Sequence, residues 1–176
     1  GVFERRAKWV PLSPEMKDFF GVSVDKMTPN DMIKLILKLD ADLLWFGGIG
    51  TYVKASSESH VDAGDRTNDA VRVNGREVRA RVIGEGANLG VTQRARVEYA
   101  LAGGRLNTDS IDNSAGVDCS DHEVNIKILL DVLVAQNKLT MRSRNALLGR
   151  MTDEVGALVL WDNYEQTQAI STIQAR

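Results

Sequence analysis

The sequence predicts an α/β protein, in which part of a doubly wound parallel sheet is followed by C-terminal helices. Short apolar segments that end in glycine-rich or polar loops alternate with segments that begin like helices. This alternation is typical of parallel sheets with helices on their faces, whose working loops follow the carboxyl ends of the strands. From Glu123 onward the apolar residues keep a helical spacing, so we expect that part to be helical.

Composition places the chain among ordinary globular proteins. Of its 176 residues, 43% are hydrophobic and 26% are charged, which is enough apolar material for a packed core. The net charge of -2 gives no basic excess, so we expect neither nucleic acid nor a membrane as a partner. The single cysteine, Cys119, cannot form an internal disulfide, and we expect a cytoplasmic location. The chain starts at Gly1 without a methionine, and we expect it to be a piece of a longer protein.

Two helix starts lie near the beginning of the chain. Residues 13–15, Ser-Pro-Glu, supply an N-cap, a proline at the first helical position and an acid in the first turn, and Gly21 ends that helix. Residues 28–31 repeat the signal before apolar residues spaced by three and four. This spacing predicts a second helix that ends near Asp40 and covers the sheet.

Three strands are expected. Residues 43–46 form a continuous apolar run that ends in the loop Gly-Gly-Ile-Gly at 47–50, which is typical of a buried parallel strand with a ligand-facing loop. Residues 78–83 are β-branched enough for a second strand, and residues 106–111 are expected to form the third. Between the first two strands we expect a polar loop and a modest helix over 67–73.

The third strand leads into a polar turn and a helix start, after a helix predicted over 92–101. In the turn 112–116, Asn113 tolerates left-handed backbone and Gly116 lets a ligand approach the main chain. Residues 120–123, Ser-Asp-His-Glu, fit a capping box with Ser120 as the N-cap. An open turn at a helix N-terminus favours negative charge, so we expect an anion site here.

The segment 84–90, Gly-Glu-Gly-Ala-Asn-Leu-Gly, has two interpretations. It follows a strand and precedes a helix, as a dinucleotide fingerprint does, but the six-residue form requires glycine where Leu89 stands. A lone Gly-x-Gly is common in tight strand-to-helix turns, so we favour that interpretation over the fingerprint. The loop 47–50 and Asn113 have the same ambiguity between an ordinary turn and a ligand contact.

We predict no metal site and no nucleophile. His60 and His122 are far apart in sequence and have no cysteine or acidic partner at ligand spacing. Cys119 has no visible base partner, so we interpret it as a packing residue.

Two segments resemble a known family. Residues 113–123, NSAGVDCSDHE, resemble the Asn-Ala-Gly-Gly-Val-x-x-Ser turn of amino-acid dehydrogenases of the glutamate and leucine type, with two positions that differ. The matching positions are Asn113, Gly116, Val117 and Ser120. Residues 85–92 are similar to that family's Glu-Gly-Ala-Asn-x-Pro-Thr-Thr, with Gly and Val in place of Pro and the first Thr. Over nearly its whole length the chain looks like the large bacterial NAD-specific glutamate dehydrogenases.

This resemblance implies a Rossmann-type fold, with residues 1–137 as the second half of an NAD-binding domain and residues 138–176 as a helical segment packed on it. The cofactor would be NAD. Asn88 and Asn113 would contact the nicotinamide ribose, and Ser120 would bind the side-chain carboxylate of glutamate. The implied cofactor-binding positions are Gly47, Gly48, Gly84, Gly86, Asn88, Asn113 and Gly116.

The implied reaction is the oxidative deamination of L-glutamate to 2-oxoglutarate and ammonia. We expect no catalytic residue in this chain, because no segment matches the lysine-bearing motifs of the family, and we expect these groups and the true fingerprint upstream of Gly1. The full-length enzyme is expected to be a homo-oligomer. A non-catalytic nucleotide-binding or interaction module of the same α/β type is the alternative, because fold alone does not fix function.

Overall fold

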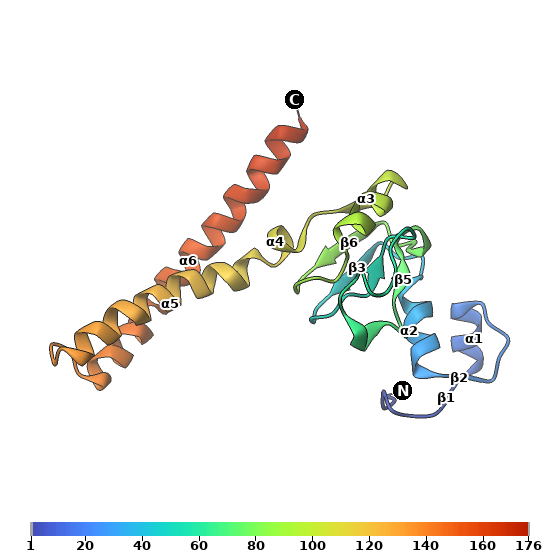
Figure 1. Ribbon diagram of the computed structural model, residues 1–176, viewed down its shortest axis with the longest axis horizontal. Coiled ribbons are helices and arrows are strands. Elements are labelled where there is room, and N and C mark those ends of the chain that lie inside the picture. Colours follow the sequence, from blue (N-terminus) through green and yellow to red (C-terminus); the bar gives the residue numbers. More distant parts are fainter. Residues whose placement is uncertain (1, 176) are drawn as a thin grey trace. The chain divides into compact units, whose positions relative to one another are not determined.

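The computed structural model describes residues 2–175, which form two compact units (Figure 1). The first unit is the chain up to Asp109, and the second is the chain from Ser110 onward. Each unit is described by itself. The domain boundary predicted at 137 falls within the second unit, in the turn between its two long helices.

A three-stranded parallel sheet forms the centre of the first unit. Its strands are β3 (Leu43–Phe46), β6 (Val82–Glu85) and β7 (Arg105–Leu106), and β6 lies between the other two. Trp45 is paired with Gly84 and Phe46 with Glu85, so β3 and β6 end side by side. The loops that follow these two strands therefore leave the sheet at the same edge.

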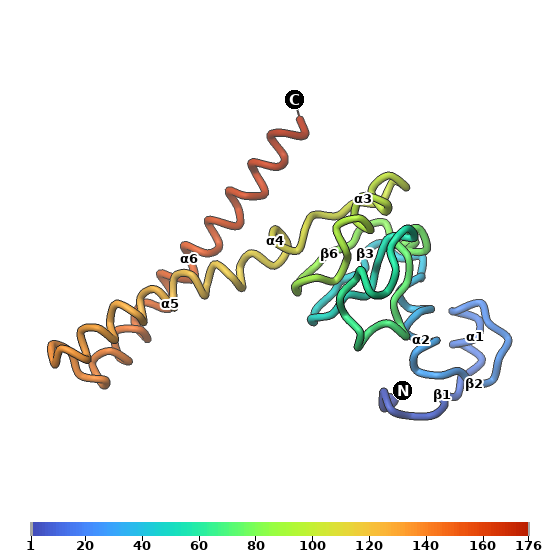
Figure 2. Tube along the Cα trace, viewed as in Figure 1, coloured from blue at the N-terminus to red at the C-terminus, as the bar shows by residue number. Residues whose placement is uncertain are grey.

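Smaller elements surround this sheet (Figure 2). An antiparallel pair and a parallel pair of two-residue strands accompany it, together with three helices and two 3-10 turns. In chain order these elements are β1 (Val10–Pro11), α1 (Pro14–Phe20), β2 (Lys26–Met27), α2 (Pro29–Leu37), β4 (Val53–Lys54), η1 (Arg66–Asn68), β5 (Val73–Asn74), η2 (Gly75–Glu77) and α3 (Gln93–Leu101).

The predicted starts of α1, α2 and α3 are confirmed by their caps. The hydroxyl oxygens of Ser13, Thr28 and Thr92 accept hydrogen bonds from the backbone N–H three residues later, at 3.3, 3.2 and 3.2 Å. Gly21, with φ of +66°, ends α1 in the left-handed conformation that favours glycine. These boundaries are local chemistry, which explains why the sequence alone could predict them.

The core of the first unit lies on one face of the sheet. Phe46 and Ile83 are buried in a cluster with Val53, Val91 and Tyr99. Alternate strand residues point to opposite faces, and on the other face Leu43, Trp45 and Val82 are exposed in this chain.

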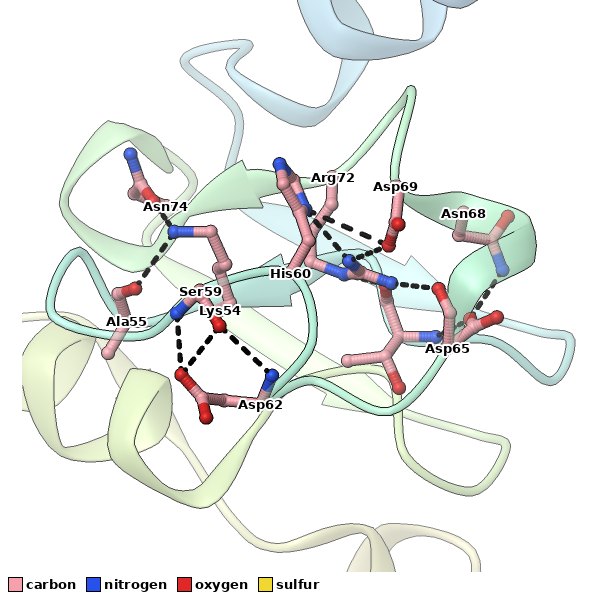
Figure 3. Close-up of polar contacts among 11 residues, drawn as sticks. Lys54, Ala55, Ser59, His60, Asp62, Asp65, Asn68, Asp69, Arg72 and Asn74 are labelled. Atoms are coloured by element: carbon pink, nitrogen blue, oxygen red, sulfur yellow. Dashed lines mark hydrogen bonds and ion pairs between the residues drawn. The ribbon is translucent and has the colours of Figure 1, made fainter.

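A buried guanidinium organises the long loop between β4 and β5, shown in Figure 3. The side chain of Arg72 is fully buried, and its Nε donates to the backbone oxygen of Thr51 at 2.8 Å. Its Nη1 donates to Asp69 Oδ1 at 2.6 Å and to His60 Nδ1 at 2.9 Å, and its Nη2 donates to the backbone oxygen of Asp65. The loop thus has few regular elements but many fixed polar contacts.

The helix predicted over 67–73 is wrong. Only the single 3-10 turn η1 forms there, and Val73 begins β5, which pairs in parallel with β4 through Val53. The Asp65 carboxylate accepts hydrogen bonds from the backbone of Thr51 at 2.8 Å and from the Asn68 side chain at 2.6 Å. The bond to Thr51, fourteen residues away, holds the backbone in a loop that local helix propensity does not predict.

The second unit is a pair of helices. α5 (Ser114–Ala135) and α6 (Met141–Gln174) pack on each other, and the short α4 (Asp109–Asp112) precedes them across the unit boundary. Asn137, with φ of +57°, lies in the connecting turn. Arg144 Nε lies 2.6 Å from Asp131 Oδ1, which joins the two helices near that turn.

Strand and helix limits after residue 78 differ from the sequence prediction. β6 begins at Val82 rather than at residue 78, and β7 ends at Leu106 rather than at 111, because only two residue pairs join β6 to β7. The predicted turn 112–116 is also wrong, since α5 already begins at Ser114.

The α/β class with parallel sheets and C-terminal helices is confirmed. Among residues 2–175, no helix has both the length and the apolar character needed to cross a membrane.

A first testable consequence concerns Gly104, which packs against the buried ring of Tyr99. A Cβ atom at position 104 would lie 2.2 Å from Tyr99 Cζ, and that ring is held by a hydrogen bond from its hydroxyl to the backbone oxygen of Ala80. We expect Gly104→Ala to destabilise the chain by about 1–3 kcal/mol, the usual cost of overpacking a core. Urea unfolding followed by circular dichroism measures this.

The control is Gly149→Ala in α6, where nothing lies within 4 Å of the added Cβ atom. This substitution should leave stability unchanged or raise it by about 0.5–1 kcal/mol, because alanine favours helix. Equal unfolding midpoints for wild type and Gly104→Ala would show that Tyr99 does not occupy this space.

Candidate functional site

The candidate site lies at the carboxyl edge of the parallel sheet. The loop 47–50 follows β3 and the loop 86–90 follows β6, and the two strands are neighbours. This edge therefore gathers the predicted cofactor positions of the first unit, which are Gly47, Gly48, Gly84, Gly86 and Asn88. Of these, Gly47, Gly48 and Asn88 are exposed, so a ligand can reach both loops.

Trp45 explains two of these glycines. A Cβ atom at Gly84 would lie 2.5 Å from Trp45 Cε3, and one at Gly86 would lie 2.2 Å from Trp45 Cζ2. Gly47 borders the same ring, with 3.6 Å from its Cβ position to Trp45 Cδ1. A side chain at position 84 or 86 would therefore displace the exposed indole of Trp45. Sequence analysis missed Trp45, whose signal is a large aromatic residue in β3 at the register of a strand glycine.

A buried ion pair between β6 and α3 supports the loop 86–90. Glu85 is fully buried at the end of β6, and Arg96 of α3 donates from Nε to Oε1 at 2.7 Å and from Nη2 to Oε2 at 3.0 Å. Burial alone would lower the pKa of the Arg96 guanidinium, but the hydrogen bonds and charge of Glu85 outweigh it and raise that pKa above its usual value. The bidentate geometry fixes the orientation of both groups.

The same pair fixes the backbone of the loop. Arg96 Nη2 also donates to Asp109 Oδ1 at 3.0 Å, and Asp109 Oδ2 accepts from the N–H of Leu89 at 2.8 Å. Glu85 Oε2 accepts from the N–H of Val91 at 3.1 Å. Leu89 is held at φ of +62°, a conformation that a non-glycine residue keeps only when its surroundings enforce it. Asn88 thus sits on a loop tied at two amides.

Sequence analysis missed this network as well. It assigned Glu85 only to a resemblance and gave Arg96 no role. The one signal available was an arginine one helical turn into α3, eleven residues after the glutamate. Arginines on helices are usually exposed, so nothing in the sequence distinguishes this one from the others.

The predicted residues of the second unit lie on α5. Asn113 is half-buried at the N-cap position, with φ of -109° and ψ of 16°, while Gly116 and Ser120 are exposed in the following turns. Spacings of three and four place the three residues on one face of the helix. The helix therefore gathers them, where the sequence had predicted a turn followed by a new helix start.

The capping box at Ser120 is wrong. Ser120 lies inside α5, and its hydroxyl donates to the backbone oxygen of Gly116 at 3.2 Å instead of accepting from a first-turn amide. No proline separates residues 114–119 from the helix, so it extends back to Ser114, whose hydroxyl oxygen lies 3.0 Å from the backbone oxygen of Ile111. The anion site predicted at a helix N-terminus beside Ser120 therefore lacks its structural basis. Asn113 does not end a strand either.

The fold and this edge define a class: an α/β protein whose parallel strands end in glycine-rich loops, one of them fixed by a buried ion pair. The model of the family described as the catalytic domain of bacterial NAD-glutamate dehydrogenase matches residues 1–173. The chain therefore belongs to the bacterial NAD-glutamate dehydrogenase family.

Individual relatives agree with the family match. The chain is 59% identical over 176 residues to the NAD-specific glutamate dehydrogenase of Pseudomonas aeruginosa and 56% identical over 170 residues to that of Halomonas elongata. It is 55% identical over 181 aligned residues to that of Mycobacterium tuberculosis. These alignments cover 97–100% of the chain, but the chain spans only 10–11% of the length of these curated relatives.

Removing Arg96 tests the support of the loop. Arg96→Met would remove the guanidinium from the buried Glu85 carboxylate, and we expect a loss of about 3–5 kcal/mol in the free energy of unfolding. The double variant Glu85→Gln/Arg96→Met should recover part of this loss, because it removes the uncompensated charge. Urea unfolding measures both variants.

The control is Arg81→Ala, which breaks the ion pair of Arg81 with Asp42, whose side chains are 78% and 88% exposed. Exposed pairs contribute little, so this variant should unfold like wild type. If Arg96→Met were as stable as Arg81→Ala, the buried pair would not hold the loop.

Proposed function

We propose that this chain is part of the NAD-binding domain of an NAD-dependent glutamate dehydrogenase and forms the second half of its Rossmann-type fold. The observation that carries the proposal is the pair of glycine-rich loops at adjacent strand ends, in a chain that belongs to this family. In open α/β sheets, ligands bind at the carboxyl ends of the strands. The whole enzyme would convert L-glutamate to 2-oxoglutarate and ammonia.

The edge of the first unit fits one end of a dinucleotide. The exposed amide of Asn88 can donate to and accept from ribose hydroxyls, and Gly47 and Gly48 leave their backbone open to close approach. Arg96 and Glu85 would act as positioning residues, because they fix the loop without reaching the ligand. NAD, when bound, supplies the hydride acceptor of the reaction.

One face of α5 carries the proposed ligand contacts of the second unit, including the one to glutamate. In this second unit, Asn113 and Gly116 are proposed cofactor-binding positions, and the exposed hydroxyl of Ser120 is proposed to bind the side-chain carboxylate of glutamate. Its bond to the oxygen of Gly116 uses the hydroxyl hydrogen, so binding a carboxylate requires that hydrogen to rotate outward. A cytoplasmic location and a homo-oligomeric full-length enzyme remain predictions.

Two substitutions in the full-length enzyme test these roles separately. Asn88→Ala should raise the KM for NAD about tenfold, equivalent to about 1.4 kcal/mol, and leave the KM for glutamate unchanged. Ser120→Ala should raise the KM for glutamate by a similar factor and leave the KM for NAD unchanged. Steady-state rates of NADH formation give both constants.

Matched controls come from the same kinds of residue elsewhere. Asn125→Ala removes an exposed amide of α5, and Ser171→Ala removes a hydroxyl that donates to the carbonyl four residues earlier, as that of Ser120 does. Both should keep wild-type constants. If Asn88→Ala and Ser120→Ala lowered the melting temperature but kept both KM values, the two residues would be structural and the assignment would fail.

A further inference from the structure

Helices α5 and α6 bring two carboxylates and an imidazole to one point. His122 Nε2 lies 3.6 Å from Asp118 Oδ1 and 3.6 Å from Asp162 Oδ2, and the three donor atoms all lie within 4.8 Å of one another. All three residues are half-buried. The sequence-based expectation that His122 has no acidic partner at ligand spacing is therefore wrong: Asp118 lies one helical turn earlier, and Asp162 comes from the other helix.

We propose that Asp118, His122 and Asp162 bind a divalent transition-metal ion of the Zn²⁺ type, which links α5 to α6. One imidazole nitrogen and two carboxylate oxygens are ligands that Zn²⁺ takes readily, and three protein ligands leave a fourth position for water. The proposal concerns the second unit alone and does not depend on the proposed NAD or glutamate contacts.

The spacing of the donor atoms suits such an ion. Zn²⁺ binds nitrogen and oxygen ligands at about 2.0–2.2 Å, so two ligands of a tetrahedral site lie about 3.3–3.6 Å apart. The two His122 separations of 3.6 Å fall at the upper end of this range. The Asp118 and Asp162 oxygens, within 4.8 Å of each other, need only a side-chain rotation to close the site.

The negative charges around Asp118 also favour a bound cation. Asp118 Oδ2 is shielded from solvent and has no hydrogen-bond partner among the described residues. Burial raises the pKa of the Asp118 carboxyl, and the neighbouring Asp162 carboxylate raises it further, while His122 lowers it. Two carboxylates thus lie beside one imidazole, and the negative charge of Asp121 adds to the repulsion at Asp118. A divalent ion offsets their repulsion more fully than one protonated histidine can.

An ion here would have a defined structural effect. Asn163, next to Asp162 in α6, accepts a hydrogen bond from the Ser114 hydroxyl in the first turn of α5. A metal at the triad would hold the next turn of α5 against the same part of α6. It would thereby order the helix segment that carries Gly116 and Ser120.

The test uses the chain after treatment with a chelator. The chain contains only two histidines, so each can be tested by substitution. Titration with Zn²⁺ in a calorimeter should show one site per chain, and the melting temperature should rise with Zn²⁺ and fall again with chelator. His122→Gln, Asp118→Asn and Asp162→Asn should each weaken binding at least tenfold. Co²⁺ should give the visible absorption of a tetrahedral site in wild type but not in these variants.

His60→Gln is the matched control, since it removes the other histidine, which lies in the first unit beside Arg72. It should bind Zn²⁺ like wild type. Circular dichroism of each variant shows that its helices are intact. Absence of Zn²⁺ binding to wild type, or equal weakening by His60→Gln and His122→Gln, would overturn the proposal. A melting temperature that responds to pH but not to Zn²⁺ would also overturn it, because the triad would then be only an ion pair.

Discussion

The buried pair of Arg96 and Glu85 is the interaction on which the candidate site depends. It joins α3 to the end of β6, and through Asp109 and Glu85 it satisfies the amides of Leu89 and Val91. Desolvating two charges offsets most of their attraction, so such a pair adds little net stability compared with a well-packed apolar core. Its contribution is to favour one loop conformation, with Leu89 in the left-handed region and Asn88 directly before the first of the two fixed amides.

The first unit uses the same device twice. Arg72, also fully buried, gathers the oxygens of Thr51, Asp65 and Asp69 and holds the loop between β4 and β5 as Arg96 holds the loop after β6. In both cases one guanidinium, a planar group with five N–H donors, holds a segment that has little regular secondary structure. Helices and strands therefore form the core of the unit, and buried arginines hold the loop between β4 and β5 and the loop after β6.

What the sequence could predict follows from the range of the interactions. The starts of α1, α2 and α3 and the strand β3 depend on neighbouring residues, and they were predicted correctly. Three features depend on long-range pairing and were predicted wrongly. They are the short β7, the early start of α5 and the absence of a helix over 67–73. The site shows the same division. The sequence identified Gly84, Gly86 and Asn88 by their motif. The indole of Trp45 and the Asp162 carboxylate beside His122 come from other elements, so only the folded chain reveals them.

The central proposal is that the loop 47–50 and the loop 86–90, of which the second is fixed by the Arg96 pair, form the cofactor edge of the sheet. Hydrogen exchange of the full-length enzyme with and without NAD tests it most directly, because exchange reports the opening of individual segments. We predict that NAD slows exchange in peptides covering both loops and leaves the turn between α5 and α6 unchanged. Unchanged exchange in both loops at saturating NAD would contradict the account.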